Sequence, residues 1–316
     1  MHRTGDGIFE FFIFSGLDLM ARFHFSVGPF AYRIDSKIPC VVQAVEKMYS
    51  DYPKLSESDW TDFHVRVVPE GSLIRQFVKP QARLFLDNAE PFGVFHQDQA
   101  GAILEWGMNW CLWLNLFHWI VFHAAMLEKD GRGLILAADS GDGKSTLAAA
   151  LAFSGWRLLS DELTLIDPED TVTLKDGEPP IARMVPVPRP ICLKNESIDV
   201  LKAFHPDLTF SLTYPETTKG RVTHVKPLKS AVDRMLERPA PRWIIFPKYV
   251  PGSEPKWTPW EKAEALIKFG GHGRGYSMLG QKGFETVANI IHHCDCWRFE
   301  YSRLEDAVAE FAKLEV

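Results

Sequence analysis

The sequence lacks the features of a nucleic-acid-binding, secreted or disulfide-stabilised protein. Its formal net charge is −6, whereas the phosphate backbones of nucleic acids select basic surfaces. It has only five cysteines in 316 residues, an odd number at irregular spacings, which indicates reduced thiols rather than a disulfide framework. No internal repeat or low-complexity tract is evident. We therefore expect a cytoplasmic protein that has no nucleic-acid partner.

A long hydrophobic run suited to a signal peptide or a membrane span is also missing. The apolar run Phe11–Phe14 is short and is flanked by acidic residues, so it predicts no secretion signal. Residues 102–127 are long enough to span a membrane. They carry polar side chains at a density that is costly in lipid: Glu105, Asn109, Asn115, His118 and His123. We interpret this segment as a buried, tryptophan-rich helix that runs into a strand, and we expect no membrane span.

The sequence does contain enough apolar material for a packed core. Hydrophobic residues make up 46% and charged residues 24% of the chain, and its length corresponds to roughly two domains of about 150 residues each. Residues 1–100 contain short strand patterns and one helical pattern, which predict a small α+β N-terminal region. Strands and helices alternate through residues 101–316, which predicts an α/β domain.

Local patterns place several elements of the second domain. We expect one strand over Val121–Leu127, a helix from Ser145 to Phe153 and a strand over Arg157–Ser160. An amphipathic helix is predicted to start at Thr258, with a proline in its first turn.

Residues 138–145 nearly match a phosphate-binding loop. The pattern requires a glycine, four free positions, and then Gly-Lys followed by Ser or Thr. Only the first glycine differs, because Ala138 stands there, and alanine is tolerated if its φ is negative. A strand before the loop and a helix after it supply the context that the motif requires.

The loop residues have predicted parts in nucleotide binding. Backbone N–H groups of such a loop form a nest for phosphate oxygens, and the following helix adds its positive end. Lys144 would supply a charge for the β and γ phosphates, and the Ser145 hydroxyl would bind Mg²⁺. The predicted nucleotide-binding residues are Asp139, Ser140, Gly141, Asp142, Gly143, Lys144, Ser145 and Thr146.

Two adjacent acids, Asp161 and Glu162, follow the strand after this helix. A Mg²⁺–nucleotide site needs a carboxylate near the loop serine, and a second acid could accept the proton of an attacking hydroxyl. Neighbouring strand residues point to opposite faces, so both acids serve one site only if the strand has ended. A solvent-facing turn is the alternative.

Cations and a histidine elsewhere are further candidates. Phosphoryl transfer needs extra positive charge on the migrating group, and we expect Arg189, Lys219 or Arg221 to supply it, with an ordinary solvated loop as the alternative for each. His123 lies in an apolar run, where a core histidine is the common case. Within residues 292–296, two cysteines are separated by one residue, whereas the cysteine pairs of zinc sites are usually separated by about two to four residues.

These motifs together resemble a known family. The chain has a histidine at position 123, the loop Asp139-Ser-Gly-Asp-Gly-Lys-Ser145, and the run Arg157-Leu-Leu-Ser-Asp-Glu162. This set resembles HPr kinase/phosphorylase over roughly residues 122–167. The whole chain looks closer to the HPr-kinase-related kinase A group, through segments such as Ile103-Leu-Glu-Trp-Gly-Met-Asn-Trp-Cys111.

The resemblance implies a P-loop nucleotide-binding core shared with phosphoenolpyruvate carboxykinases and γ-phosphoryl transfer to a hydroxyl. It makes Asp161 the base, Ser145 and Glu162 the metal ligands, and His123 a neighbour that orients or tunes the acid, so the predicted catalytic residues are Asp161, His123 and Lys144. The chain departs from the family at Ala138 and Glu162, and the downstream Glu-x-Arg-Gly-Leu-Gly run is not visible. These departures predict a kinase whose acceptor differs from HPr.

The sequence therefore predicts an ATP-dependent, Mg²⁺-using kinase that acts on a hydroxyl of a protein, peptide or small molecule. Two alternatives stay open. One is a non-catalytic ATP-binding sensor that recruits a partner, and the other is a phosphoenolpyruvate-carboxykinase-like enzyme, which would need a cationic carboxylate clamp. The sequence does not specify the acceptor or the choice between ATP and GTP. It also leaves the oligomeric state open, and a homo-oligomer is among the states that it allows.

Overall fold

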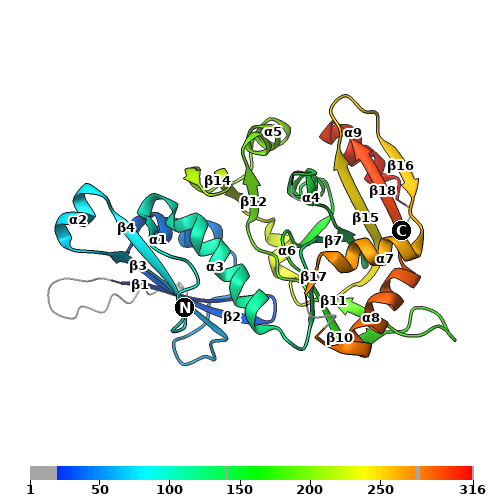
Figure 1. Cartoon of the computed structure of the whole chain (residues 1–316), viewed down its shortest axis with the longest axis horizontal. Coiled ribbons are helices and arrows are strands. Elements are labelled where there is room, and N and C mark those ends of the chain that lie inside the picture. The colour runs from blue at the N-terminus through cyan, green and yellow to red at the C-terminus, as the bar shows by residue number, and fades with distance from the viewer. Residues whose placement is uncertain (1–19, 140, 275–277, 315–316) are drawn as a thin grey trace, which may run out of the picture.

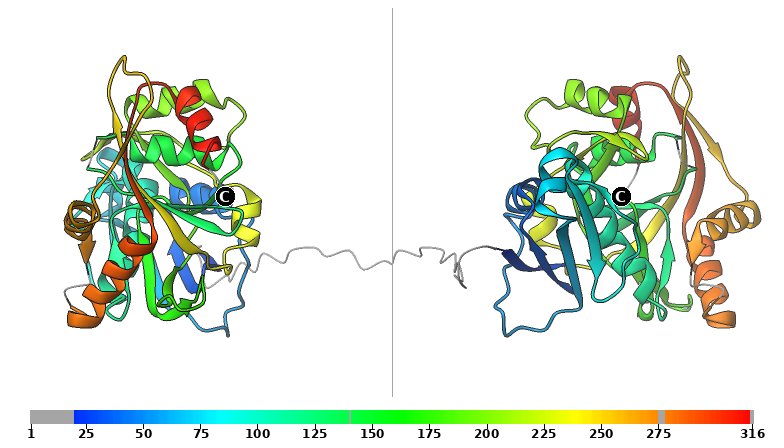
Figure 2. Two further views of the ribbon diagram at one scale, coloured as in Figure 1. Left: turned by 90° about the vertical axis from the view of Figure 1, so that its right-hand side faces the viewer. Right: turned by 60° about the vertical axis from the view of Figure 1, so that its left-hand side comes forward.

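The computed structural model describes residues 20–139, 141–274 and 278–314. Over these residues the chain is a mixed α/β protein with four sheets, as the sequence predicts at that level. A smaller N-terminal part lies beside a larger C-terminal part (Figures 1 and 2). No helix in the described ranges is long and apolar enough to cross a membrane. The division into domains at residue 100 stays a prediction.

The N-terminal part is built on a five-stranded sheet. Phe63, Val65 and Val67 are buried on one face of it, alternating with less buried residues, which is the period of a sheet with one face on the core. The helices α1 (Pro39–Met48) and α3 (Ala100–Asn115) pack against this core. In sheet order the strands are β1 (Ala21–Val27), β2 (Phe30–Ser36), β3 (Phe63–Glu70), β4 (Gln81–Leu86) and β5 (Phe95–His96), with α2 (Leu73–Val78) between β3 and β4 and a short 3-10 helix η1 (Gln97–Gln99) before α3.

Helix α3 is apolar on most sides because it is covered from two directions. It packs on β3 and β4 of the N-terminal sheet and also contacts β13 and β14 of the C-terminal part. Eleven of its sixteen residues are buried, among them the polar Glu105. The interpretation as a buried helix rather than a membrane span is consistent with this packing. The polar side chains of Glu105 and Asn109 are therefore held at the junction of the two parts.

The C-terminal part is centred on a six-stranded sheet between two layers of helices. Ile245 packs in a cluster with α4 (Lys144–Ala152) and α9 (Leu304–Ala312), whereas the neighbouring Ile244 packs in a cluster with α7 (Lys262–Gly271) and α8 (Gly280–His293). This alternation explains why β15 is almost continuously hydrophobic. In sheet order the strands are β16 (Lys256–Pro259), β18 (Asp295–Tyr301), β15 (Ala240–Tyr249), β8 (Arg132–Leu136), β7 (Ala125–Lys129) and β9 (Arg157–Ser160).

Two small sheets complete the C-terminal part. One follows the order β11-β10-β6-β17, and the other follows the order β12-β14-β13. The first consists of β11 (Ile181–Met184), β10 (Thr164–Val172), β6 (Ile120–Phe122) and β17 (Gly273–Arg274), and the second of β12 (Ile191–Lys194), β14 (Gly220–Val225) and β13 (Tyr214–Thr217). The helix α5 (Glu196–Phe204) contacts β12, and the helix α6 (Lys229–Asp233) contacts β9 of the six-stranded sheet.

Two expected elements differ from the structure. The single strand expected over Val121–Leu127 is broken at His123 and Ala124, because β6 pairs with β10 and β17 whereas β7 pairs with β8 and β9 in another sheet. The helix expected from Thr258 starts later, at Lys262, because residues 256–259 pair with β18 as an edge strand. The first difference places His123 where the chain passes from one sheet to the next.

Candidate functional site

The glycine-rich loop joins β8 to α4, at the end of a central strand. Gly141 and Gly143 have φ values of +100° and +85°, in the left-handed region that favours glycine. A Cβ atom on Gly143 would lie 2.6 Å from the Tyr301 hydroxyl oxygen. Ala138 is outside the set of residues with positive φ, so its methyl group is compatible with the entry to the loop. Ser140 lies outside the described residues.

The sides of this loop are anchored by neighbouring elements. The Asp139 carboxylate pairs with the Lys268 ammonium of α7 at 2.7 Å. The Asp142 carbonyl accepts a hydrogen bond of 3.1 Å from the Tyr249 backbone N–H at the end of β15. The loop is therefore tied both to the sheet and to the helix layer behind it.

Helix α4 starts with a lysine that links the loop to the acidic pair. Lys144 is only 7% exposed, and its ammonium donates to the Asp161 backbone carbonyl at 2.7 Å. The helix begins after Gly143 without a side-chain cap, so the N–H groups of its first turn, which includes Ser145 and Thr146, have no capping side chain. Such a helix start favours an anion.

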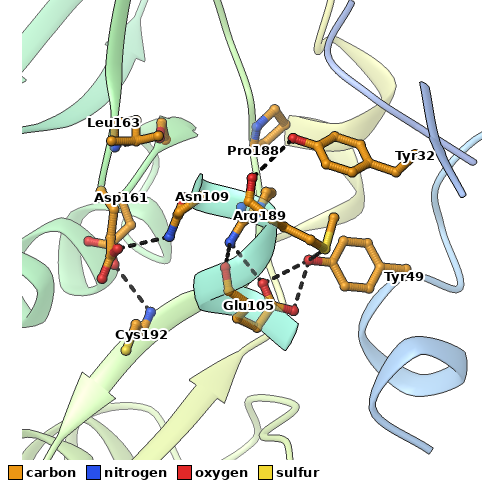
Figure 3. Close-up of polar contacts among 12 residues, drawn as sticks. Tyr32, Tyr49, Glu105, Asn109, Asp161, Leu163, Pro188, Arg189 and Cys192 are labelled. Atoms are coloured by element: carbon orange, nitrogen blue, oxygen red, sulfur yellow. Dashed lines mark hydrogen bonds and ion pairs between the residues drawn. The ribbon is translucent and has the colours of Figure 1, made fainter. Parts of the chain in front are cut away.

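The acidic pair follows the end of β9, outside any strand. Asp161 is 5% exposed, and its Oδ2 accepts a hydrogen bond from the Cys192 N–H at 3.1 Å. Glu162 is half-buried, and its Oε2 accepts from the Asn109 side-chain amide at 2.8 Å (Figure 3, in which Asp161, Asn109 and Cys192 are labelled). Because the strand has ended, both acids lie in one region, as the sequence argument required.

The two carboxyl groups have pKa values shifted in opposite directions. Burial raises the pKa of Asp161 above its usual value, and the nearby Lys144 ammonium only partly opposes this rise. Burial also acts to raise the pKa of Glu162, but the ammonium groups of Lys219, Lys144 and Lys194 outweigh it and hold that pKa below its usual value. Carboxyl pairs whose pKa values are pushed apart are typical of acid–base sites.

His123 lies at the switch between β6 and β7. The residue keeps part of its surface exposed, and its backbone N–H donates to the His272 carbonyl at 2.9 Å. The protein around the ring lowers the pKa of His123 to about 4 by desolvation, followed by repulsion from Lys144. The imidazole is therefore neutral near pH 7, and Glu162 acts on it in the opposite sense, by raising the pKa.

The three predicted phosphate or substrate contacts lie in different surroundings. Arg189 is buried, and one nitrogen of its guanidinium contacts the Glu105 carboxylate at 2.9 Å (Figure 3). The Lys219 ammonium lies 4.5 Å from the centre of the Trp106 ring. Arg221 pairs with Asp199 of α5 on the surface. The structure thus brings Arg189 and Lys219 toward the acidic pair, and it does not bring Arg221 there.

A small cavity of about 20 Å³ lies beside the acidic pair. This volume is enough for about one water molecule. Several buried polar atoms in its lining residues have no hydrogen-bond partner within the described part of the chain: Trp106 Nε1, Asp161 Oδ1, Arg189 Nε and Nη1, and His224 Nε2. Buried polar atoms of this kind are normally satisfied by water or a ligand. These unsatisfied polar atoms make the cavity suited to a small polar occupant.

Sequence reasoning missed the contribution of helix α3. Glu105 holds Arg189, and Asn109, one turn later, holds Glu162. The signal was present, because two polar residues four positions apart share one face of a helix whose other residues, up to its last turn, are apolar.

The side chains beside the loop fit a magnesium ion that is bound together with a nucleotide. Mg²⁺ takes oxygen ligands, usually from one or two carboxylates, phosphates and water. The Ser145 hydroxyl and the two acids are oxygen donors, and Asp161 Oδ1 has no partner among the described residues. No group of three or more His, Cys, Asp or Glu side chains in that part of the chain could hold a metal. Phosphate oxygens would have to complete such a site.

Comparison with known proteins gives one family match and a distant structural match. Residues 109–175 match the family described as SynChlorMet cassette protein ScmC. This stretch contains Asn109, the glycine-rich loop and the acidic pair, but it is less than half of the chain, so it shows similarity rather than membership. No curated protein matches the sequence.

Among solved structures, the chain is similar to the Hpr(Ser) kinase/phosphatase from Coxiella burnetii. The two are 13% identical, and the match covers 61% of this chain and 96% of that chain, with a TM-score of 0.26. A TM-score this low does not establish a shared fold, so neither fold nor function is inferred from it. The resemblance to HPr kinase/phosphorylase stays a prediction that rests on the sequence motifs.

Proposed function

We propose that this protein is an ATP-dependent, HPr-kinase-like phosphotransferase that moves the γ-phosphate to a hydroxyl of a protein, peptide or small molecule. The observation that carries the proposal is the contact of 2.7 Å between the Lys144 ammonium and the Asp161 carbonyl. It joins the glycine-rich loop, the start of α4 and the acidic pair into one site. A cationic loop for phosphates next to a buried acid is the combination that phosphoryl transfer needs.

The nucleotide would bind along the loop and the start of α4. The backbone N–H groups of the glycine-rich loop and of the first turn of α4, with Ser145 and Thr146, would surround the phosphate oxygens. Lys144 would hold the β and γ phosphates, and Ser145 and Glu162 would hold Mg²⁺. When bound, Mg²⁺ neutralises negative charge that develops on the transferring group. The low pKa of Glu162 keeps its carboxylate ionised for that part.

Asp161 would take the proton of the attacking hydroxyl. Its raised pKa makes it a better proton acceptor than an ordinary aspartate. Its free Oδ1 lies at the small cavity, where one water could relay the proton. His123, which is neutral near pH 7, would act as a polar neighbour of the acids rather than as a second cation.

The proposal is tested by incubating the protein with γ-labelled ATP and cell extract and following the label. Lys144→Ala should abolish ATP binding or transfer, because it removes the phosphate-binding charge. Asp161→Asn should preserve ATP binding and lower the transfer rate at least about 100-fold, the scale of a lost general base. Lys229→Ala, at a surface lysine paired with Asp233, is the control and should match the wild type. Full transfer by the Asp161→Asn variant would show that Asp161 is not the base.

The burial of Asp161 favours one alternative function, an ATP-binding sensor that does not transfer phosphate. Asp161 is only 5% exposed, so its carboxyl group has little contact with solvent. An acceptor must therefore reach it through the cavity. The labelling experiment separates the two functions. A sensor would bind ATP in a Lys144-dependent way and leave the γ-phosphate in place in every extract.

A further inference from the structure

A second, larger cavity opens beside Glu162. Its volume is about 450 Å³, within the range of small-molecule sites. Its walls come from the connection before β5, from α3 and from the turn between β13 and β14. It shares Trp106, Asn109 and Glu162 with the small cavity. The two cavities therefore adjoin, and an occupant of the larger one would lie next to the acidic pair.

The wall of the larger cavity is aromatic, with polar groups where it meets the acidic pair. Four aromatic side chains line it: Phe92, Phe95, Trp106 and Trp110. The rings of Phe92 and Trp110 pack edge to face, with their centres 5.7 Å apart. The polar lining includes Asn109 and Glu162, which are hydrogen-bonded to each other, and Lys219. A ligand with an aromatic body and a hydroxyl at its tip is complementary to this wall.

Exposed apolar side chains lie at this cavity. Val94 is 40% exposed and Trp110 is 41% exposed, and both line it. Apolar side chains that gather at a concave site mark ligand binding. A folded protein partner would need a surface of roughly 800 Å², whereas a concave site of this volume suits a small molecule.

We propose that the larger cavity binds the phosphoryl acceptor, and that the acceptor is a small aromatic alcohol. The inference rests on the proposed kinase function. The acceptor ring would lie against Trp106 and Trp110, and its hydroxyl would lie at Asn109 and Glu162. The hydroxyl oxygen would form a bond to the γ-phosphorus as the bond from that phosphorus to the ADP oxygen breaks. The hydroxyl proton would pass to Asp161, and the products would be ADP and a phosphate monoester.

Binding is tested first, without ATP, by saturation-transfer NMR with 2-phenylethanol and indole-3-ethanol. Trp110→Ala removes one aromatic wall. Gly93→Trp fills the cavity, and the position has room for a side chain because a Cβ there meets no atom within 4 Å. Each variant should weaken binding by about tenfold or more. Trp60→Ala, at a tryptophan that is 80% exposed and outside the cavity lining, is the matched control and should bind like the wild type.

Several results would overturn this inference. One is that neither alcohol binds, and another is that both variants bind them as well as the Trp60→Ala control. Binding only of a short peptide, N-acetyl-Ser-Phe-amide, would replace the small-molecule acceptor by a peptide.

Transfer is tested next, with γ-labelled ATP, the two alcohols and cell extract. Formation of labelled phosphate esters of the alcohols, in smaller amounts with the Trp110→Ala variant than with the wild type, would support the inference. Labelling of another acceptor while the alcohols stay unlabelled would overturn the inference alone. Labelling of no acceptor, despite ATP binding, would overturn the proposed function and the inference that rests on it.

Discussion

His224 is a buried histidine among the residues that line the small cavity beside the acidic pair. It is 2% exposed, and its Nε2 has no hydrogen-bond partner within the described residues. Burial lowers the pKa of His224 to about 3, with repulsion from Arg189 and Lys194 acting in the same direction and Glu162 opposing them. The His224 ring is therefore neutral in the folded state, and this makes the stability of the folded protein depend on pH.

The folded protein should lose stability as the pH falls, in part because of His224. In the unfolded chain a histidine binds a proton near pH 6.5, whereas in the folded chain it does so near pH 3. The unfolded state therefore gains the proton first, and the free energy of unfolding should fall by about 2 kcal/mol between pH 7 and pH 5 from this residue. Urea unfolding at both pH values, for the wild type and for His224→Gln, measures this contribution.

The comparison isolates one residue, because all other titrating groups are common to the two proteins. The buried Asp161, whose pKa is raised, changes stability in the opposite direction as the pH falls, and it does so in both proteins. Equal pH dependence in the wild type and in the variant would contradict the prediction. If the free energies of unfolding of the two proteins differ by the same amount at both pH values, the substitution has changed packing alone.

The residues that sequence could identify are those that a local motif defines. Lys144, Asp161 and Glu162 stand at fixed spacings in the chain, and the structure brings them together. Arg189 was expected from sequence as a candidate phosphate contact, and Asn109 shares a helix face with Glu105, but the partners of Asn109 and Arg189 lie 53 and 84 positions away. Pairing over such separations depends on how the elements pack, which no short pattern records.

At the scale of elements, the turn from β8 into α4 depends on Gly143. The residue has a φ of +85°, and a Cβ would lie 2.6 Å from the Tyr301 hydroxyl oxygen of β18. Gly143→Ala should lower the free energy of unfolding by about 2–3 kcal/mol, because both the left-handed backbone and the contact are unfavourable for alanine. It should also weaken ATP binding, because the loop would have to move.

Chemical denaturation with a matched glycine variant tests this prediction. Gly252 also has a positive φ, +76°, but a Cβ there would meet no atom within 4 Å. Gly252→Ala should therefore show only the backbone contribution of about 1 kcal/mol. Equal losses in the two variants would mean that Tyr301 gives way without penalty.

Sequence predicted the elements that carry strong local patterns. The strand Arg157–Ser160 agrees with the prediction, and the helix expected at Ser145 starts one residue earlier. The expected strand over Val121–Leu127 was wrong, because its apolar run fits either of two sheets and only the pairing partners show where it breaks. Short apolar runs carry no record of such a switch. His123 lies at that switch, so its surroundings could not be predicted either.

At the scale of the whole molecule, a buried ion pair joins the N-terminal part to the C-terminal part. Glu105 comes from α3, which packs on the N-terminal sheet, and Arg189 comes from the segment before β12. Arg189 donates to the Glu105 carboxylate at 2.9 Å, and the Tyr49 hydroxyl donates to the same carboxylate at 2.8 Å. Nearby, the Tyr52 hydroxyl donates to the Pro188 carbonyl at 2.6 Å. These bonds hold α3, and with it Asn109, against the acidic pair.

Removing one partner of this ion pair should be far more harmful than removing both. Arg189→Met would leave the Glu105 carboxylate buried without its cation, which typically lowers the free energy of unfolding by about 3–5 kcal/mol. The double variant Glu105→Gln/Arg189→Met leaves no buried charge, and Tyr49 can still donate to the amide oxygen. Its stability should return close to that of the wild type, since neutral replacements of buried ion pairs are often tolerated. Chemical denaturation of the wild type, both single variants and the double variant measures the coupling.

The same set of variants decides whether Arg189 does more than join the two parts. Its Nε and Nη1 have no partner within the described residues, and the side chain lines the small cavity at the acidic pair. If its role is structural, the double variant should recover phosphoryl transfer together with stability. If the guanidinium also contacts the migrating phosphate, the double variant should still fold like the wild type and bind ATP. It should then transfer the phosphate at least about 100-fold more slowly, because a charge that stabilises the transition state is lost. Measuring transfer only after stability is restored separates the two roles, because loss of folding can then no longer account for loss of activity.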